Sequence, residues 1–169
     1  MTLAYTILGL VTLQRLGELW YASRNTIQLK ARGGVEHGQR HYPLMVALHA
    51  SWLTAIAVGI QSDRIVRVLP LLAFVLLQVL RVWVLATLGR YWTTRVITIP
   101  ETPLVRRGPY RFLSHPNYVV VAGEMALLPL VFGQVSNAIL FSILNGVVLA
   151  WRIHVEEAAL GPRRRLSVD

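Results

Sequence analysis

Long runs of apolar residues constrain this chain more than any other feature of its sequence. A helix needs about 20 predominantly apolar residues to cross the hydrocarbon core of a bilayer. Five stretches approach this length: residues 2–21, 42–60, 66–88, 117–132 and 135–153. We therefore predict a single all-α integral membrane domain over residues 1–169, with about five transmembrane helices.

The composition favours a membrane protein over a soluble one. Hydrophobic residues make up 54% of the chain and charged residues 15%, against about 25% charged residues in a typical soluble domain. The absence of cysteine excludes disulfides, thiolate catalysis and cysteine-ligated metals. Only Gly133 and Gln134 separate the last two apolar stretches, which predicts that they form a short helical hairpin.

Basic residues are distributed unevenly between the two ends of the predicted helices. The chain has 17 lysines and arginines and a formal net charge of +9. In a five-helix topology fifteen of them, Arg165 included, fall on one side of the membrane, and Arg64 and Arg67 fall on the other. Because cytoplasmic loops carry the excess of basic residues, we expect the N-terminus outside and the C-terminus in the cytoplasm. With no basic recognition helix or stacking-aromatic module visible, no nucleic-acid partner is expected.

The residues that can carry chemistry concentrate in the second part of the chain. Residues 1–65 are predicted to form two N-terminal helices with a basic loop, and residues 66–169 a core with a turn-rich loop at 89–118. The sequence contains no Gly-x-Gly-x-x-Gly, no phosphate-binding P-loop and no Gly-x-Ser-x-Gly. A nucleotide-like cofactor would therefore have to be held by the ends of membrane helices.

The loop ends in a predicted helix start at His115 and Pro116. Proline suits the first position of a helix, and the free N–H groups of such a start favour an anion. Arg106, Arg107 and Arg111 add positive charge nearby. The segment indicates either a site for a carboxylate or phosphate, or a capped helix start whose arginines touch lipid headgroups.

Several polar residues lie inside the predicted helices. Asn117 and Glu124 are seven residues apart and share one face of the fourth helix. Asn145, Arg152 and Glu156 share one face of the fifth, where Arg152 and Glu156 have the spacing of an ion pair. This face is either the polar wall of a ligand site or an interfacial ion pair at a helix end.

Other polar residues have simpler explanations. Arg15 and Glu18 have the spacing of an intramembrane ion pair, and His49 of the second helix is expected to be a hydrogen-bonded interior histidine. His37 and His41 are four residues apart, but the glycines around them argue against a helix. We therefore predict no metal site.

An ordered set of motifs resembles the isoprenylcysteine carboxyl methyltransferase family, whose wider relatives include the phospholipid methyltransferases. The motifs are Leu88-Gly-Arg-Tyr-Trp-Thr93, Leu104-Val-Arg-Arg-Gly-Pro-Tyr-Arg111, His115-Pro-Asn-Tyr118, Glu124 and Arg152-Ile-His-Val-Glu-Glu-Ala-Ala-Leu160. The resemblance covers roughly residues 77–160. The first half, with Gln14-Arg-Leu-Gly-Glu-Leu19, Arg24-Asn25 and His41-Tyr-Pro43, is similar to a bacterial branch linked to O-methylation of long-chain polyketide pyrones and resorcinols. Ser114 departs from the arginine common in the family and removes one positive charge.

The resemblance implies S-adenosylmethionine as methyl donor, in a cytoplasm-facing pocket, and a lipophilic or prenylated acceptor that arrives from the bilayer. The residues implied in cofactor binding are Tyr110, Arg111, His115, Pro116, Asn117, Tyr118, Glu156 and Glu157. For catalysis, Arg152 would orient a carboxylate acceptor, which needs no base. A phenol or enol acceptor would need one, and Glu124 or His115 would be considered.

Two other functions remain open at this point. A phospholipid N-methyltransferase would act on a deprotonated amine and differ in its methylated product. A non-enzymatic membrane transporter or assembly protein would scatter polar residues along a pathway, whereas here they gather at the cytoplasmic ends of the last two helices.

Overall fold

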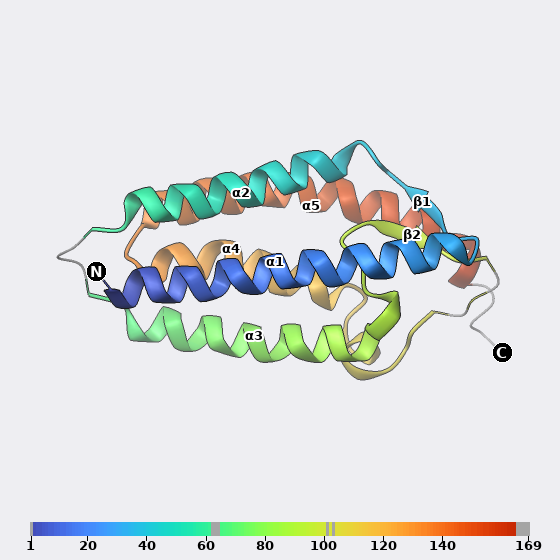
Figure 1. Ribbon diagram of the computed structural model, residues 1–169, viewed down its shortest axis with the longest axis horizontal. Helices are drawn as coiled ribbons and strands as arrows, with labels where there is room; N and C mark the ends of the chain where they lie inside the picture. Colours follow the sequence, from blue (N-terminus) through green and yellow to red (C-terminus); the bar gives the residue numbers. More distant parts are fainter. Residues whose placement is uncertain (1, 62–64, 101, 103, 165–169) are drawn as a thin grey trace.

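The computed structural model describes residues 2–61, 65–100, 102 and 104–164. Five α-helices lie side by side along its long axis (Figure 1). They are α1 (Thr2–Ala31), α2 (His41–Gly59), α3 (Val68–Leu88), α4 (Pro116–Val131) and α5 (Val135–Arg164). Arg64 and Arg165, counted in the charge distribution, lie outside the described residues.

Each predicted apolar stretch forms a helix, and the helix starts agree with the prediction to within two residues. The ends of α1 and α5 do not, because these helices continue to Ala31 and Arg164, beyond the predicted limits at residues 21 and 153. An apolar run ends where the environment becomes polar, but a helix ends only where its backbone is interrupted. In α1 that interruption comes at Gly33, whose φ of 81° takes the chain out of the helix.

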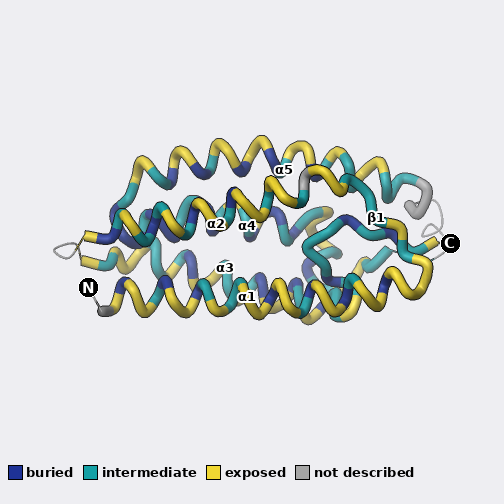
Figure 2. Tube along the Cα trace, turned by 45° about the horizontal axis from the view of Figure 1, so that its top comes forward, coloured by how far each residue is buried: buried dark blue, intermediate teal, exposed yellow. Residues whose placement is uncertain are grey.

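Three helices within the described residues are long and apolar enough to cross a membrane: Tyr42–Gly59, Val68–Tyr91 and Val135–Gly161. The apolar helix α4 is shorter, and α1 is interrupted by polar residues at its middle. Outward-facing surfaces of the bundle are exposed along their length (Figure 2). Many of these exposed residues are large and apolar, among them Leu13, Leu76 and Val147. The chain is therefore a multi-pass integral membrane protein.

A short two-stranded antiparallel sheet lies at one end of the bundle, called here the strand end (Figure 1). Strand β1 (Val35–His37) pairs with β2 (Val96–Thr98), so the loop after α1 is joined to the loop after α3. His37, for which no metal-binding role was predicted, places Nε2 2.8 Å from Thr98 Oγ1. The sequence analysis missed this sheet because three-residue strands are too short to show an alternating pattern.

Buried charges hold three helices together inside the bundle. Glu124 of α4 accepts hydrogen bonds from Arg15 Nη2 of α1 at 2.7 Å and from Arg81 Nε of α3 at 2.9 Å. Glu18 accepts from Arg15 Nη1 at 2.8 Å and from Arg81 Nη1 at 3.0 Å, which confirms the predicted Arg15–Glu18 pair. Gln78 adds a bond to Glu124 at 2.7 Å. These five residues, called the ion cluster, balance two positive charges with two negative ones.

Removing one carboxylate from the ion cluster should destabilise the fold strongly. Glu124→Ala leaves Arg15 and Arg81 buried with uncompensated charge, which costs about 3–5 kcal/mol in the free energy of unfolding. Unfolding of the detergent-purified protein by heat or denaturant measures this loss. Glu157→Ala, the same substitution at a half-exposed position of α5, is the control and should cost less than about 1 kcal/mol. Equal losses for the two variants would contradict a structural role for the cluster.

Candidate functional site

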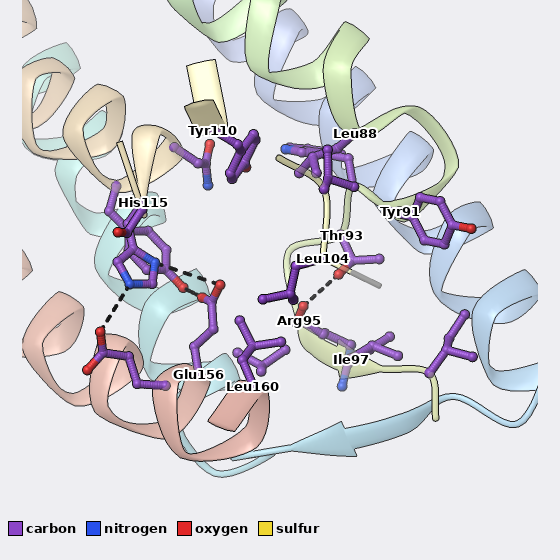
Figure 3. Close-up of a pocket in the computed structure, with 18 of the residues that line it drawn as sticks. Leu88, Tyr91, Thr93, Arg95, Ile97, Leu104, Tyr110, His115, Glu156 and Leu160 are labelled. Carbon is purple, nitrogen blue, oxygen red and sulfur yellow. Dashed lines mark hydrogen bonds and ion pairs between the residues drawn. The ribbon is translucent and has the colours of Figure 1, made fainter. Parts of the chain in front are cut away.

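A cavity of about 620 Å³ lies at the strand end and is called the polar cavity (Figure 3). It is bounded by the end of α3, the loop after it, the start of α4 and the last turns of α5. Two 3₁₀ turns shape the loop, Gly89–Tyr91 and Gly108–Arg111. The side chains on its wall that can bind polar or aromatic groups include Tyr91, Trp92, Arg95, Arg106, Tyr110, His115, Asn117, Tyr118, Arg152, Glu156 and Glu157.

Contacts with the helices hold the loop in place. Asn25 of α1 donates from Nδ2 to the carbonyl oxygens of Gly89 at 3.1 Å and Trp92 at 2.8 Å. At the second turn, Gly108 has a φ of 58° and packs so closely on Thr87 that a Cβ would lie 2.4 Å from its hydroxyl oxygen. This position therefore requires glycine. The loop is thus anchored to both α1 and α3.

The start of α4 lies directly on the cavity, as the sequence predicts. His115 is the N-cap residue and Pro116 the first helical residue. His115 Nε2 and Asn117 Oδ1 are buried and have no hydrogen-bond partner among the residues that the structure describes. Buried polar atoms normally have partners, so these two atoms indicate that the cavity receives a polar ligand.

Arg152 and Glu156 are linked differently from the prediction, through the Tyr118 hydroxyl. Arg152 donates from Nε to that oxygen at 2.9 Å, and the hydroxyl donates to Glu156. The His115 ring stacks on Tyr118 with its centroid 5.3 Å away. Its nitrogens lie 3.8 Å from Glu156 and 3.6 Å from Glu157. Helical spacing alone favoured a direct ion pair because it carries no information about α4, the neighbouring helix that supplies Tyr118.

Burial raises the pKa of the Tyr110 hydroxyl, and the negative charge of Glu156 raises it further. This hydroxyl therefore stays protonated at physiological pH. Tyr110 presents a neutral aromatic ring to the polar cavity (Figure 3).

The structure brings together most of the predicted site residues: Tyr110, His115, Asn117, Tyr118, Arg152, Glu156 and Glu157 all line the polar cavity. Three predicted residues lie elsewhere. The 3₁₀ turn directs the Arg111 guanidinium over the Phe112 ring at 5.9 Å, Pro116 is buried at the helix start, and Glu124 belongs to the ion cluster. Sequence reasoning missed Tyr91, Trp92 and Arg95 as wall residues, although adjacent aromatic residues after Gly89 were an available signal.

A second cavity of about 220 Å³, called the inner cavity, lies among α1, α2, α4 and α5. Its wall is mainly apolar, with Leu16, Val46, Leu53 and Val148 among its residues. It also reaches the ion cluster at Arg15, Glu18 and Arg81. The two cavities share five wall residues: Trp92, Thr93, Asn117, Tyr118 and Arg152. A polar and an apolar compartment therefore meet at one wall.

The fold and the two cavities define a multi-pass membrane protein with a candidate ligand site at one end of its helical bundle. The family model of the isoprenylcysteine carboxyl methyltransferase (ICMT) family matches residues 68–162, and the chain belongs to this family, which confirms the resemblance found in the sequence. Two curated proteins are similar over most of their length. "Uncharacterized protein YpbQ" of Bacillus subtilis is 35% identical over 92% of this chain and 95% of its own. An "Uncharacterized protein" of Haemophilus influenzae is 22% identical over 86% and 88%. No solved structure matches the chain significantly.

The ion pairs of Glu36 with Lys30 and Arg95 make the stability of the fold depend on pH. Burial raises the pKa of the Glu36 carboxyl, but hydrogen bonds from Lys30 and Arg95 outweigh it, so the pKa lies below its usual range. A carboxyl with a lowered pKa in the folded state stabilises the fold above its unfolded pKa. That stabilisation is lost as the pH falls through the folded pKa.

We expect Glu36→Gln to lower the thermal unfolding midpoint by about 2–4 °C at pH 7. The difference from the wild type should shrink as the pH falls below about 4.5, because the carboxyl of the unfolded chain begins to bind a proton there while the folded one is still charged. Thermal unfolding of both proteins in detergent at a series of pH values measures this difference. A gap that stays constant down to pH 3 would contradict the assigned role of Glu36.

Proposed function

We propose that this protein is an integral membrane methyltransferase that uses S-adenosylmethionine to methylate an oxygen of a lipophilic acceptor. The observation that carries the proposal is the pair of cavities that share the wall of Tyr118 and Arg152. A charged cofactor needs polar surroundings and an apolar acceptor needs apolar ones. The polar cavity on one side of that wall and the inner cavity on the other supply these two environments. Membership of a methyltransferase family supports the reaction class.

The residues of the polar cavity fit the cofactor group by group. Glu156 and Glu157 suit its cationic groups, and Arg95 and Arg106 suit its carboxylate. Tyr91, Trp92 and Tyr110 offer aromatic surfaces for the adenine. Asn117 Oδ1, which has no hydrogen-bond partner in the described part of the chain, would gain one. When bound, the cofactor supplies a methyl group on a positively charged sulfur.

Residues of the shared wall would align the acceptor oxygen with that methyl group. Arg152 is buried, with 5% of its surface exposed, and its guanidinium is held by Tyr118 and by Met45 Sδ at 2.9 Å. A fixed cation at this point would orient an oxygen that carries negative charge. The positively charged sulfur already makes a good leaving group, so the reaction needs little further activation of the methyl group. Alignment of the two reactants would therefore be the main contribution of the protein to catalysis.

The proposal includes the topology predicted from the sequence. With α1 and α4 also crossing the membrane, the strand end would face the cytoplasm, since Lys30, Arg32 and Arg95 lie there. The apolar residues that α1 exposes support its place in lipid: Leu3, Leu10, Leu13, Leu16 and Trp20. The polar cavity would then open toward a water-soluble cofactor, and the inner cavity would lie at membrane depth.

The alternative functions are less well supported. A phospholipid N-methyltransferase would bring an amine next to Arg152, where its protonated form would be repelled. A transporter would use intramembrane charges along a pathway, whereas the charges of the ion cluster are paired with one another. These observations favour an oxygen acceptor and an enzyme.

Binding of S-adenosylmethionine to the detergent-purified protein tests the proposal directly. We expect binding by calorimetry, weakened about tenfold or more by Glu156→Ala and by His115→Ala, because each removes a polar partner from the cavity wall. His154→Ala, on an exposed face of α5, is the matched control and should bind like the wild type. Arg111→Ala should also bind normally, because that guanidinium lies over Phe112. Absence of binding by well-folded wild-type protein would refute the proposed function.

A further inference from the structure

Arg95 lies on the wall of the polar cavity and is held by two residues from outside that wall (Figure 3). Its Nη1 donates to the carboxylate of Glu36 in β1. Its guanidinium carbon lies 3.9 Å from the centre of the Tyr42 ring. Neither Glu36 nor Tyr42 is among the described residues that line the cavity. Arg95 is therefore held by side chains that a ligand in the cavity would leave in place.

The two-stranded sheet explains how these segments meet. Strand β1 pairs with β2 in antiparallel register, and Arg95 directly precedes β2. Glu36 is the middle residue of β1, and Tyr42 lies in the first turn of α2, the helix that follows β1. The His41-Tyr-Pro43 motif, to which the proposed function gives no role, thus contacts a wall residue of the cavity.

Arg95 keeps hydrogen-bond donors that a ligand could use. A guanidinium carries five N–H donors, and in the described part of the chain only Nη1 of Arg95 donates a side-chain hydrogen bond. The Arg95 side chain is 33% exposed, whereas that of its partner Glu36 is 4% exposed. The donors on Nε and Nη2 therefore remain, in a rigid fork whose geometry matches a carboxylate.

The charges around Arg95 also favour an anion. Glu36 is paired with both Lys30 and Arg95, so a single carboxylate faces two cations. The Tyr42 ring attracts the guanidinium through its π-electrons and forms no ion pair with it. The group therefore has one positive charge in excess, which a bound carboxylate would balance.

Two other arginines of the described chain line the polar cavity and suit this role less well. Arg106 is exposed to solvent, where an ion pair contributes little. Arg152 lies on the wall shared with the inner cavity, and its guanidinium contacts Tyr118 and Met45. Arg95 lines the polar cavity and not the inner one. It is therefore the arginine best suited to fix an anionic group of the cofactor.

The same cavity also carries negative charge. Glu156 of α5 lines it, and its hydrogen-bond partner is the Tyr118 hydroxyl and not an arginine of the loop (Figure 3). Arg95 and Glu156 thus contribute opposite charges from two different segments of the chain. Such a wall suits a ligand with both a carboxylate and a cationic group, as in the amino-acid end of S-adenosylmethionine.

We propose that Arg95 binds the carboxylate of S-adenosylmethionine, and that Tyr42 is the positioning residue that holds the guanidinium in the orientation for this contact. The inference rests on the proposed function and assigns one part of the cofactor to one side chain. It also makes the N-terminal part of the chain necessary for the cofactor site, because Tyr42 lies before residue 68, where the family match begins.

Two forms of the cofactor test the assignment of Arg95. Decarboxylated S-adenosylmethionine lacks the carboxylate and keeps the sulfonium, so the ratio of the two dissociation constants reports what the carboxylate contributes. Calorimetry with the detergent-purified protein measures both constants. We expect the wild type to bind S-adenosylmethionine about tenfold or more tightly than the decarboxylated form. Arg95→Gln should reduce this preference to about twofold or less.

Tyr42→Leu tests the positioning role without changing the charge of the site. We expect it to reduce the preference by about threefold or more, because the cation–π contact is lost. Tyr42→Phe keeps the ring and should retain the wild-type preference. In the Arg95→Gln background, Tyr42→Leu should have no further effect on the preference. Binding of the decarboxylated form should stay within about threefold of the wild type in every variant, which shows that the cavity is intact.

The outcomes separate this inference from the proposed function. Equal weakening of both cofactor forms by Tyr42→Leu would overturn the positioning role, because general damage to the cavity does not distinguish between them. Loss of the preference in Tyr42→Phe would overturn it too, since the ring is still present. If the wild type binds both forms equally tightly, the assignment of Arg95 falls and the methyltransferase proposal stands. If it binds neither form, the proposed function fails and the inference fails with it.

Discussion

The ion cluster is the interaction on which the rest of the structure depends. Isolated charges are costly in a membrane, so Arg15, Glu18, Arg81 and Glu124 are stabilised only where α1, α3 and α4 bring them together. Apolar packing alone tolerates small rotations and shifts between helices, whereas these short charged bonds do not. The cluster thereby fixes how far α1 is displaced along α3 and α4. That displacement decides where Asn25, ten residues beyond Arg15, meets the carbonyl oxygens of Gly89 and Trp92.

The polar cavity follows from this arrangement. Inside the hydrocarbon, backbone groups must be paired within helices, so an irregular ligand-binding loop can exist only at helix ends or in protein-lined space. In this chain the loop after α3 lies at the strand end, held by Asn25, by the close contact of Gly108 with Thr87, and by the pairing of β1 with β2. Helices supply the rigid walls, and the loop between them supplies the aromatic surfaces.

Much of this organisation could be predicted from the sequence, because it depends on residues that are close to one another along the chain. Apolar runs gave all five helices, the His-Pro pair gave the start of α4, and three-residue spacing gave the Arg15–Glu18 pair. Relations between distant segments could not be predicted. Helical periodicity shows which residues share a face, but not which helix lies opposite that face. The bonds from Arg15 to Glu124 and from Arg152 to Tyr118, and the β1–β2 pairing, all cross between helices or loops far apart in sequence.

The two cavities are also lined by different parts of the chain. The matched family region begins at residue 68, after α2 has ended, and it contains most of the polar cavity. Among the described side chains, none from α2 lines the polar cavity, whereas Met45, Val46, His49 and Trp52 of this helix line the inner one. Under the proposed function, the later helices would hold the cofactor and α2 would choose the acceptor. Substitutions at these positions of α2 would then change the preferred acceptor without touching the cofactor site, because that helix supplies a large part of the wall of the inner cavity.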